Sequence, residues 1–268
     1  MILVTGGTGL VGAHLLYKLV SSHEKVRAIY RNEGKLSNVK NVFSFYTTDY
    51  KPLFNAIEWV QADILDIPAL SEAFIGISHV YHCAAFVSFE PDKYQLLRQT
   101  NIEGTANIVN ICISNTVEKL CYVSSIATLG HELNKKPITE NTNWNPEDDN
   151  NVYAITKYGA EMEVWRATQE GLDAVIVNPG VILGAGIWRY GTGSLFKKAH
   201  KGIKRYTPGT IALIGVDDVV TIMIKLMNSP ITNERFVLVA ESWTYKDFLQ
   251  ALAKSVNARV PKKLASPW

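Results

Sequence analysis

The chain has 268 residues, of which 47% are hydrophobic, and its formal net charge at neutral pH is only +2. This length is enough for one α/β unit with a small appendage and a sizeable core. Nucleic acid is excluded as the main partner, because the lysines near residues 197–205 form one local cluster rather than a basic stripe.

The cysteine pattern and the apolar stretches indicate the compartment. The first predicted strand begins at Met1, which leaves no room for a secretion signal ahead of it. The longest apolar stretch, residues 211–227, contains Asp217 and Asp218, so we expect no membrane span. We therefore expect a soluble cytoplasmic protein with reduced thiols and no metal site. Its cysteines are odd in number and lack metal-like spacing: Cys83, Cys112 and Cys121.

The first thirty-one residues have the pattern of a nucleotide-binding unit. An apolar strand at residues 1–4 precedes glycines at Gly6, Gly9 and Gly12, and a helix and a strand at residues 26–30 follow. The first glycine permits a tight turn, the second lets the backbone approach a pyrophosphate, and the third allows close packing of helix on strand. Glycines also cluster in ordinary turns, but this strand and helix context favours a dinucleotide site.

The remaining pattern alternates strands with helices, which predicts a parallel sheet covered on both faces, with ligands at the carboxyl ends of the strands. Residues 32–55 are polar and irregular, with a short alternating run at 42–46. The last residues, 261–268, end without an obvious capped element, as in a truncated chain. Strands are expected at residues 57–62, 78–83, 119–125, 174–178 and 235–239, and helices at 68–74 (with Pro68 in the first turn), 92–114, 153–170, 194–201, 217–227 and 244–256 (with Thr244 as N-cap).

Three polar residues have the pattern of a general acid–base site. Tyr153 and Lys157 are four apart on a predicted helix, so they share one face and the ammonium can favour the phenolate. Ser124 and Ser125 end a predicted strand at the edge where α/β sheets place reacting groups. Taken singly, the first pair is also consistent with an exposed helix face, and the serines with the start of a loop.

With these motifs, the chain resembles the extended short-chain dehydrogenases/reductases, specifically the NAD-dependent epimerase/dehydratase family and its dihydroflavonol-4-reductase-like branch. The resemblance implies a Rossmann-type doubly wound sheet over residues 1–180, and a mixed region over 181–268 that forms a substrate cap and returns to the sheet. The matching stretches are residues 5–12, 62–64, 82–85, 101–105, 124–127, 153–157 and 178–181.

The resemblance also implies roles for individual residues. Tyr153 matches the family's acid/base, and Lys157 matches the lysine that binds the nicotinamide ribose and lowers the tyrosine pKa. Ser125 matches the serine that orients the substrate, and it is preferred to Ser124 by its spacing from Gly130. The implied cofactor contacts, besides Tyr153 and Lys157, are Gly6, Thr8, Gly9, Leu10, Val11, Gly12, Asp63, Ile64, Ala84, Ala85, Pro179 and Val181, whereas Asn101 and Thr105 are given a structural role first.

The end of the second strand bears on the form of the cofactor. NAD-preferring relatives have an acidic residue there, whereas this chain has Arg31, whose charge and bidentate geometry suit a 2′-phosphate. We therefore expect NADP, with NAD as the alternative if Arg31 is only a solvated surface residue.

The expected activity is hydride transfer between nicotinamide and a carbonyl or secondary alcohol of a small organic substrate. One alternative is a nucleotide-sugar epimerase or dehydratase with tightly bound NAD, and the other is a non-catalytic redox sensor. A homodimer through helices 92–114 and 153–170 would resemble the family. Four aromatic residues could line an apolar substrate pocket or belong to the core: Phe86, Phe89, Trp188 and Tyr190.

Overall fold

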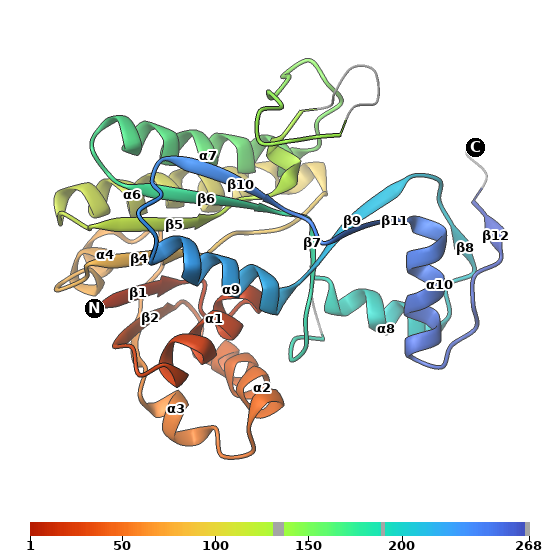
Figure 1. The fold of residues 1–268 in the computed structure, drawn as a ribbon, viewed down its shortest axis with the longest axis horizontal. Helices are drawn as coiled ribbons and strands as arrows, with labels where there is room; N and C mark the ends of the chain where they lie inside the picture. Colours follow the sequence, from red (N-terminus) through yellow and green to blue (C-terminus); the bar gives the residue numbers. More distant parts are fainter. Residues whose placement is uncertain (131–136, 189–190, 266–268) are drawn as a thin grey trace.

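The structure is a computed structural model that describes residues 1–130, 137–188 and 191–265. Its main element is a seven-stranded sheet with the order β10-β6-β5-β4-β1-β2-β3, in which all neighbours are parallel (Figure 1). This confirms the predicted Rossmann-type α/β fold. The strands are β1 (Ile2–Thr5), β2 (Val26–Tyr30), β3 (Glu58–Gln61), β4 (His79–His82), β5 (Lys119–Val123), β6 (Ala174–Pro179) and β10 (Glu234–Leu238).

Helices cover both faces of this sheet, as its apolar strands require. In β1, Leu3 packs into one core and Val4 into the other, so the strand is buried on both sides. One face is covered by α1 (Leu10–Ser21), α2 (Leu36–Tyr46), α3 (Lys51–Asn55) and α9 (Val216–Met227). The other face is covered by α4 (Ile67–Ala73), α6 (Gly104–Ser114) and α7 (Val152–Gln169).

The expectation of an irregular segment at residues 32–55 is wrong. This stretch forms a short 3-10 helix, η1 (Glu33–Lys35), followed by α2 and α3. Val39, Val42 and Phe43 are fully buried at helical spacing, whereas Phe45 is 62% exposed. Residues 42–46 have the alternating pattern of a strand because Phe45 is apolar at an exposed helix position, where a polar residue is usual.

The predicted helix at residues 92–114 is helical throughout but not uniform. It consists of a 3-10 turn η2 (Pro91–Lys93), α5 (Tyr94–Leu97), a π-helical segment η3 (Arg98–Glu103) and α6. A Cβ at Gly104 would lie 2.4 Å from the Cδ1 atom of Ile64, so this glycine allows the helix to approach the loop that follows β3. The π-helical segment carries Asn101 toward the active-site loops described below.

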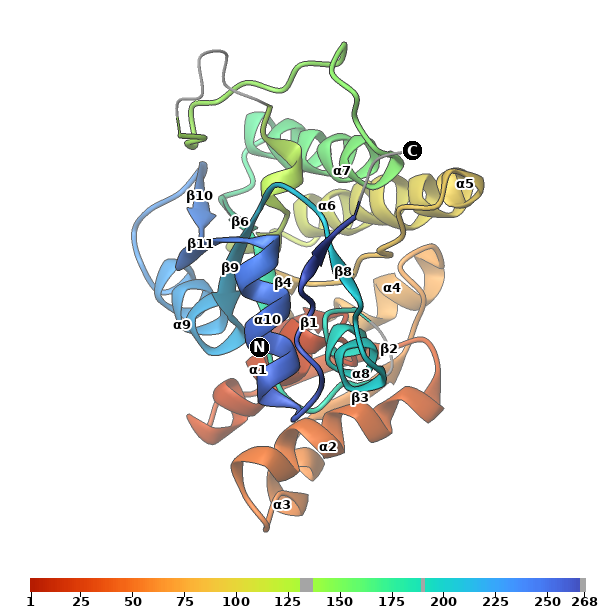
Figure 2. The same cartoon turned by 90° about the vertical axis from the view of Figure 1, so that its right-hand side faces the viewer.

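A smaller lobe projects from the carboxyl end of the sheet (Figures 1 and 2). Its core contains Ile211, Leu213, Phe248 and Leu252. Through α9 and β10, residues 216–238, the chain returns to the large sheet before it enters the lobe a second time. The lobe contains β7 (Val181–Leu183), β9 (Thr210–Gly215) and β11 (Glu241–Thr244) in one sheet, β8 (Arg205–Tyr206) and β12 (Lys263–Leu264) in another, and α8 (Gly193–Lys201) and α10 (Tyr245–Ser255); none of these five strands was predicted.

Side-chain caps define where several helices begin. Asp66 caps α4 ahead of Pro68, and Asn151 caps α7 by accepting from the Ala154 N–H at 3.0 Å. Thr244 caps α10 through the Asp247 N–H at 3.1 Å, which confirms its predicted role.

Two further observations concern compartment and thiols. Within the described ranges, no helix is both long enough and apolar enough to cross a membrane. All three cysteines carry free thiols, with Cys112 and Cys121 buried and Cys83 half-buried.

Candidate active site

The predicted site residues gather at the carboxyl ends of the central strands. The chain leaves β1 and β4 in opposite directions along the sheet, and such a switch point is where open α/β sheets bind ligands. The loops after β1, β4 and β5 carry Gly6, Ala84 and Ser125, respectively, and Val181 begins β7 shortly after β6 ends.

The glycine turn after β1 is packed too tightly for side chains. Gly6 has a φ of +66°, and a Cβ there would lie 2.6 Å from the Ala84 amide nitrogen. At Gly12 a Cβ would lie 2.3 Å from the Gly6 carbonyl oxygen, which also accepts the Gly9 N–H at 2.9 Å. The turn therefore needs glycine at Gly6 and Gly12, two of the three positions in the predicted motif.

The N-terminus of α1 fits a pyrophosphate. Gly9 is its N-cap and offers no side-chain acceptor, and the first turn contains no acidic residue. The backbone N–H groups around Leu10 and Val11 and the positive end of the helix dipole thus face the turn without a protein anion. Thr8 is half-buried beside them.

Arg31 and Asp63, two predicted cofactor contacts, lie together at the end of β2. Arg31 Nη1 is 3.5 Å from Asp63 Oδ2, and the two side chains are 60% and 32% exposed. An exposed pair of this kind contributes little stability, so the guanidinium is free to exchange partners. Ile64, beside Asp63, is buried against Gly104.

The loop after β4 is held by Asn101. Its side chain accepts from the Phe86 N–H at 2.8 Å and donates to the Phe86 carbonyl at 3.0 Å and to Thr156 at 3.2 Å. Asn101 is 1% exposed, so its predicted structural role is confirmed. At the start of the same loop, the Ala84 N–H donates to Thr5 Oγ1 at 3.2 Å, and Ala85 follows, exposed.

The structure brings Ser125 and Tyr153 together, and Lys157 lies one helical turn further along α7. Burial raises the pKa of the Tyr153 phenol above its usual value, and a side-chain hydrogen bond with Ser125 opposes this rise. Ser125 is half-buried, whereas the Ser124 hydroxyl is buried and donates to Glu161 at 2.6 Å. The structure thus places Ser125, rather than Ser124, beside the phenol.

Lys157 is 1% exposed, and its ammonium is bonded within the protein. It donates to the Tyr122 hydroxyl at 2.6 Å and to the Val123 carbonyl at 2.9 Å. Burial lowers the pKa of Lys157 to about 7, and the Glu161 carboxylate opposes this decrease. The effect of Lys157 on the pKa of Tyr153 stays a prediction.

No sequence pattern indicated the buried carboxylate of Glu161, which lies one helical turn beyond Lys157. Its Oε2 accepts from Ser124, from Thr128 at 2.7 Å and from Asn178 at 2.9 Å. Its Oε1 accepts from Trp165 and from Arg235 at 3.1 Å. Glu161 is 0% exposed and ties the 3-10 turn η4 (Ile126–Thr128), which follows Ser125, to α7, β6 and β10.

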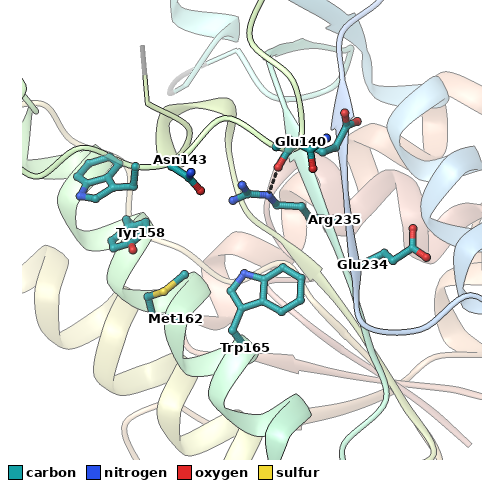
Figure 3. Close-up of a pocket in the computed structure, with 9 residues that line it drawn as sticks. Glu140, Asn143, Tyr158, Met162, Trp165, Glu234 and Arg235 are labelled. Carbon is teal, nitrogen blue, oxygen red and sulfur yellow. Dashed lines mark hydrogen bonds between the residues drawn. The ribbon is translucent and has the colours of Figure 1, made fainter. Parts of the chain in front are cut away.

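Arg235 connects the Glu161 carboxylate to a cavity beside α7, which Arg235 helps to line (Figure 3). It donates to the Glu140 carbonyl at 2.8 Å and to the Thr142 carbonyl at 3.2 Å, and the Glu140 carboxylate accepts the Val237 N–H at 2.8 Å. The cavity has a volume of about 440 Å³, and its lining includes no predicted catalytic or cofactor residue. It is lined by Glu140, Asn141, Asn143, Trp144, Tyr158, Met162, Trp165, Glu234 and Arg235.

The remaining predicted residues border the site from β6 and the loops. Pro179 is buried at the end of β6, and Val181, half-buried, begins β7. Phe89 is 64% exposed, and its ring meets that of Tyr153 edge to face with centroids 5.5 Å apart. Trp188 is exposed and packs against Phe196 of α8, whereas Tyr190 lies outside the described residues.

Residues 2–238 match the model of the NAD dependent epimerase/dehydratase family. The chain belongs to this family. The match spans the glycine turn, the three clustered polar residues and the return of β10 to the sheet, so the resemblance expected from the motifs is confirmed.

Curated proteins similar to this chain include a sterol demethylase protein and two reductases. "Sterol demethylase protein B" of Methylococcus capsulatus is 28% identical over 99% of this chain and 77% of its own length. A putative dihydroflavonol 4-reductase of Synechocystis is 28% identical over 99% and 75%. Cinnamoyl-CoA reductase 1 of Petunia hybrida is 26% identical over 95% and 77%. These relatives support an NAD(P)-dependent enzyme.

Solved structures show the same fold. UDP-glucose 4-epimerase of Thermotoga maritima, with UDP-glucose, matches with a TM-score of 0.81 and 20% identity over 99% of this chain and 85% of that chain. WbmG of Bordetella bronchiseptica, in complex with NAD and UDP, matches with a TM-score of 0.79 and 18% identity over 98% and 80%.

The glycine turn can be tested with two alanine substitutions that share a backbone conformation. Gly76 has a φ of +75° and nothing within 4 Å of an added Cβ, unlike Gly6. We expect Gly76→Ala to lower the free energy of unfolding by about 1 kcal/mol through backbone strain alone. We expect Gly6→Ala to lower it by about 3 kcal/mol or more, because strain and a backbone clash combine. Urea denaturation measures both, and equal losses would contradict the packed turn.

The buried carboxylate can be tested against a partly exposed one on the same helix. We expect Glu161→Gln to lower the free energy of unfolding by about 3 kcal/mol, because it leaves the Arg235 guanidinium, only 17% exposed, without its counter-charge. The control Glu163→Gln removes a 3.0 Å pair with the half-exposed Arg166 and should cost at most about 0.5 kcal/mol. Thermal or urea unfolding measures the difference, and similar costs would show that Glu161 does not organise this region.

Proposed function

We propose that this protein is an NADP-dependent oxidoreductase that transfers hydride between nicotinamide and a carbonyl or secondary alcohol of a small organic substrate. The observation that carries the proposal is the hydrogen bond between Ser125 and Tyr153, with Lys157 one helical turn further on, at the carboxyl edge of a dinucleotide-type sheet.

The chain's residues would hold and move the proton. The bound nicotinamide would supply or accept the hydride. Tyr153 would donate its phenolic proton to the nascent alkoxide, and its raised pKa keeps it protonated for that step. Ser125 would hold the substrate oxygen beside the phenol. Lys157, resembling the family's lysine, would bind the nicotinamide ribose.

Arg31 supports NADP over NAD. It is exposed at the end of β2, and its partner Asp63 is itself half-exposed, so a 2′-phosphate can replace that carboxylate without desolvating a buried ion. A charged bidentate contact of this kind is absent for NAD, which has a hydroxyl at the same position.

Exposed apolar side chains beside the phenol support a substrate with an apolar body. Phe89 contacts the Tyr153 ring, and Val87, two residues earlier in the same loop, is 56% exposed. Burial of these groups by a substrate would be favourable. The printed names of the relatives, dihydroflavonol 4-reductase and cinnamoyl-CoA reductase, are consistent with a reducible carbonyl on such a substrate.

A second candidate is a nucleotide-sugar epimerase or dehydratase with tightly bound NAD. The family description and the epimerase-like folds favour it, and α8 carries Lys197, Lys198 and Lys201, which could receive a diphosphate. The same Tyr153 and Lys157 would serve this reaction. It predicts NAD that copurifies with the protein, so cofactor preference distinguishes the two functions.

We expect Arg31→Ala to weaken NADPH binding about 10- to 100-fold while leaving NADH binding nearly unchanged, because only NADPH loses a charge-assisted hydrogen bond. Fluorescence titration with each nucleotide measures this. Lys25→Ala, which removes a positive charge at the other end of β2, is the control and should change neither affinity. Tighter NADH binding by the unmodified protein would instead support the epimerase or dehydratase.

We expect Tyr153→Phe to reduce turnover at least about 100-fold, because the variant has no proton to donate. Its affinity for the nicotinamide cofactor should stay within about twofold of the unmodified protein, since the ring is retained. Tyr158→Phe is the matched control on the same helix, because Tyr158 stacks on Trp144 instead. Undiminished turnover in Tyr153→Phe would overturn the proposed function.

A further inference from the structure

We propose that Tyr122 is a positioning residue for Lys157, and that its hydroxyl links this lysine through Thr105 and His82 to Thr5, directly before the glycine turn. The inference rests on the proposed function for its catalytic meaning. Its structural content stands on buried contacts alone.

Tyr122 contacts Lys157 in two ways. Its hydroxyl accepts a proton of the ammonium at 2.6 Å, and the Lys157 Nζ atom lies 4.3 Å from the centroid of the tyrosine ring. Both side chains are almost completely buried, so no water competes for these contacts. The Val123 carbonyl takes a second proton of the ammonium, which leaves one N–H for a bound molecule.

The chain of hydrogen bonds continues away from the lysine. Thr105 bonds the Tyr122 hydroxyl and lies 3.0 Å from His82 Nε2, while His82 Nδ1 lies 2.6 Å from Thr5 Oγ1. The His82 ring also stacks on the Tyr122 ring at 5.4 Å. Thr5 in turn receives the Ala84 N–H. The network therefore joins the lysine to both loops that border the predicted cofactor site.

The neutral state of His82 limits the direction of these bonds. Burial, reinforced by the charge of Lys157, lowers the pKa of His82 to about 3. A neutral imidazole accepts at one nitrogen and donates at the other. His82 therefore donates to one of its two threonine partners, Thr5 and Thr105, and accepts from the other.

Tyr122 matters because the charge of Lys157 is held only marginally. Burial lowers the pKa of Lys157 to about 7, whereas Glu161 and Cys83 are the groups that oppose it. The other titratable groups around it are Tyr122 and the neutral His82. A hydroxyl that accepts from the ammonium stabilises its charged form, so loss of this hydroxyl favours the neutral amine.

The direct test measures the titration of Lys157 without cofactor or substrate. Protein labelled with carbon-13 at the lysine Cε is titrated by NMR, with the Lys157 signal assigned from its loss in Lys157→Met. Tyr122→Phe retains the ring and removes only the hydroxyl. We expect it to lower the pKa of Lys157 by about one unit, a tenfold change in the protonation equilibrium.

Tyr81→Phe is the matched control. Tyr81 is 1% exposed on the adjacent strand β4, and its register partner on β5 is Cys121, so the substitution removes a buried hydroxyl from the same sheet. The pKa of Lys157 should not change in this variant. An unchanged pKa in Tyr122→Phe, or the same shift in both variants, would overturn the inference.

A second readout connects the positioning to the reaction. If reduction requires the ammonium, kcat/KM falls as the pH rises through the pKa of Lys157, and Tyr122→Phe should move this fall to lower pH by about one unit. Adding Tyr122→Phe to Lys157→Met should cause no further loss of cofactor affinity, since Tyr122 acts through the lysine. Additive losses would indicate a general packing role. If Tyr153→Phe stayed active, the proposed function would fail while the NMR result stood.

Discussion

Two opposite charges buried one helical turn apart on α7 determine how the active-site edge is built. Removing an ammonium or a carboxylate from water costs several kcal/mol per ion unless each is bonded on all sides. Lys157 finds its partners on β5, in Tyr122 and Val123. Glu161 takes donors from the turn after β5, from β6 and from β10. The hydrogen bonds to these two charged groups therefore fix the strands relative to α7. They position Ser125, which follows β5, and Tyr153, which lies on α7.

The strand order supplies the complementary constraint. Because β1 and β4 are neighbours, the glycine turn and the Ala84 loop lie against each other, close enough that Gly6 has no room for a Cβ. Thr5, His82 and Tyr122 thus join the predicted dinucleotide site to the residues proposed to transfer the proton. In the proposed network, the residue before the glycine turn and the lysine ammonium belong to one hydrogen-bonded structure.

Sequence patterns predicted those helices and strands whose apolar residues recur with the period of the element. They also predicted the motif residues that a glycine turn or helical spacing places close together. Residues 32–55 were mispredicted because Phe45 is exposed, and β8 and β12 of the small lobe, with two residues each, are too short to show a repeat. The roles of Tyr122, His82 and Glu161 could not be found, since no spacing in the sequence links these residues to their partners. Their contacts span up to 77 positions, as between Thr5 and His82, and depend on strand order that no local pattern contains.

The contacts of Arg235 and Glu140 also cover part of an edge of the large sheet. β10 is the last strand of the large sheet, and such an edge can pair with another chain through its unused backbone groups. Here the Glu140 carboxylate accepts the N–H of Val237 on β10. Arg235 donates to the backbone carbonyls of Glu140 and Thr142 beside it. The segment that contains Glu140 and Thr142 thereby occupies part of the edge at which another strand could add, and the same guanidinium that neutralises a buried carboxylate holds this segment in place.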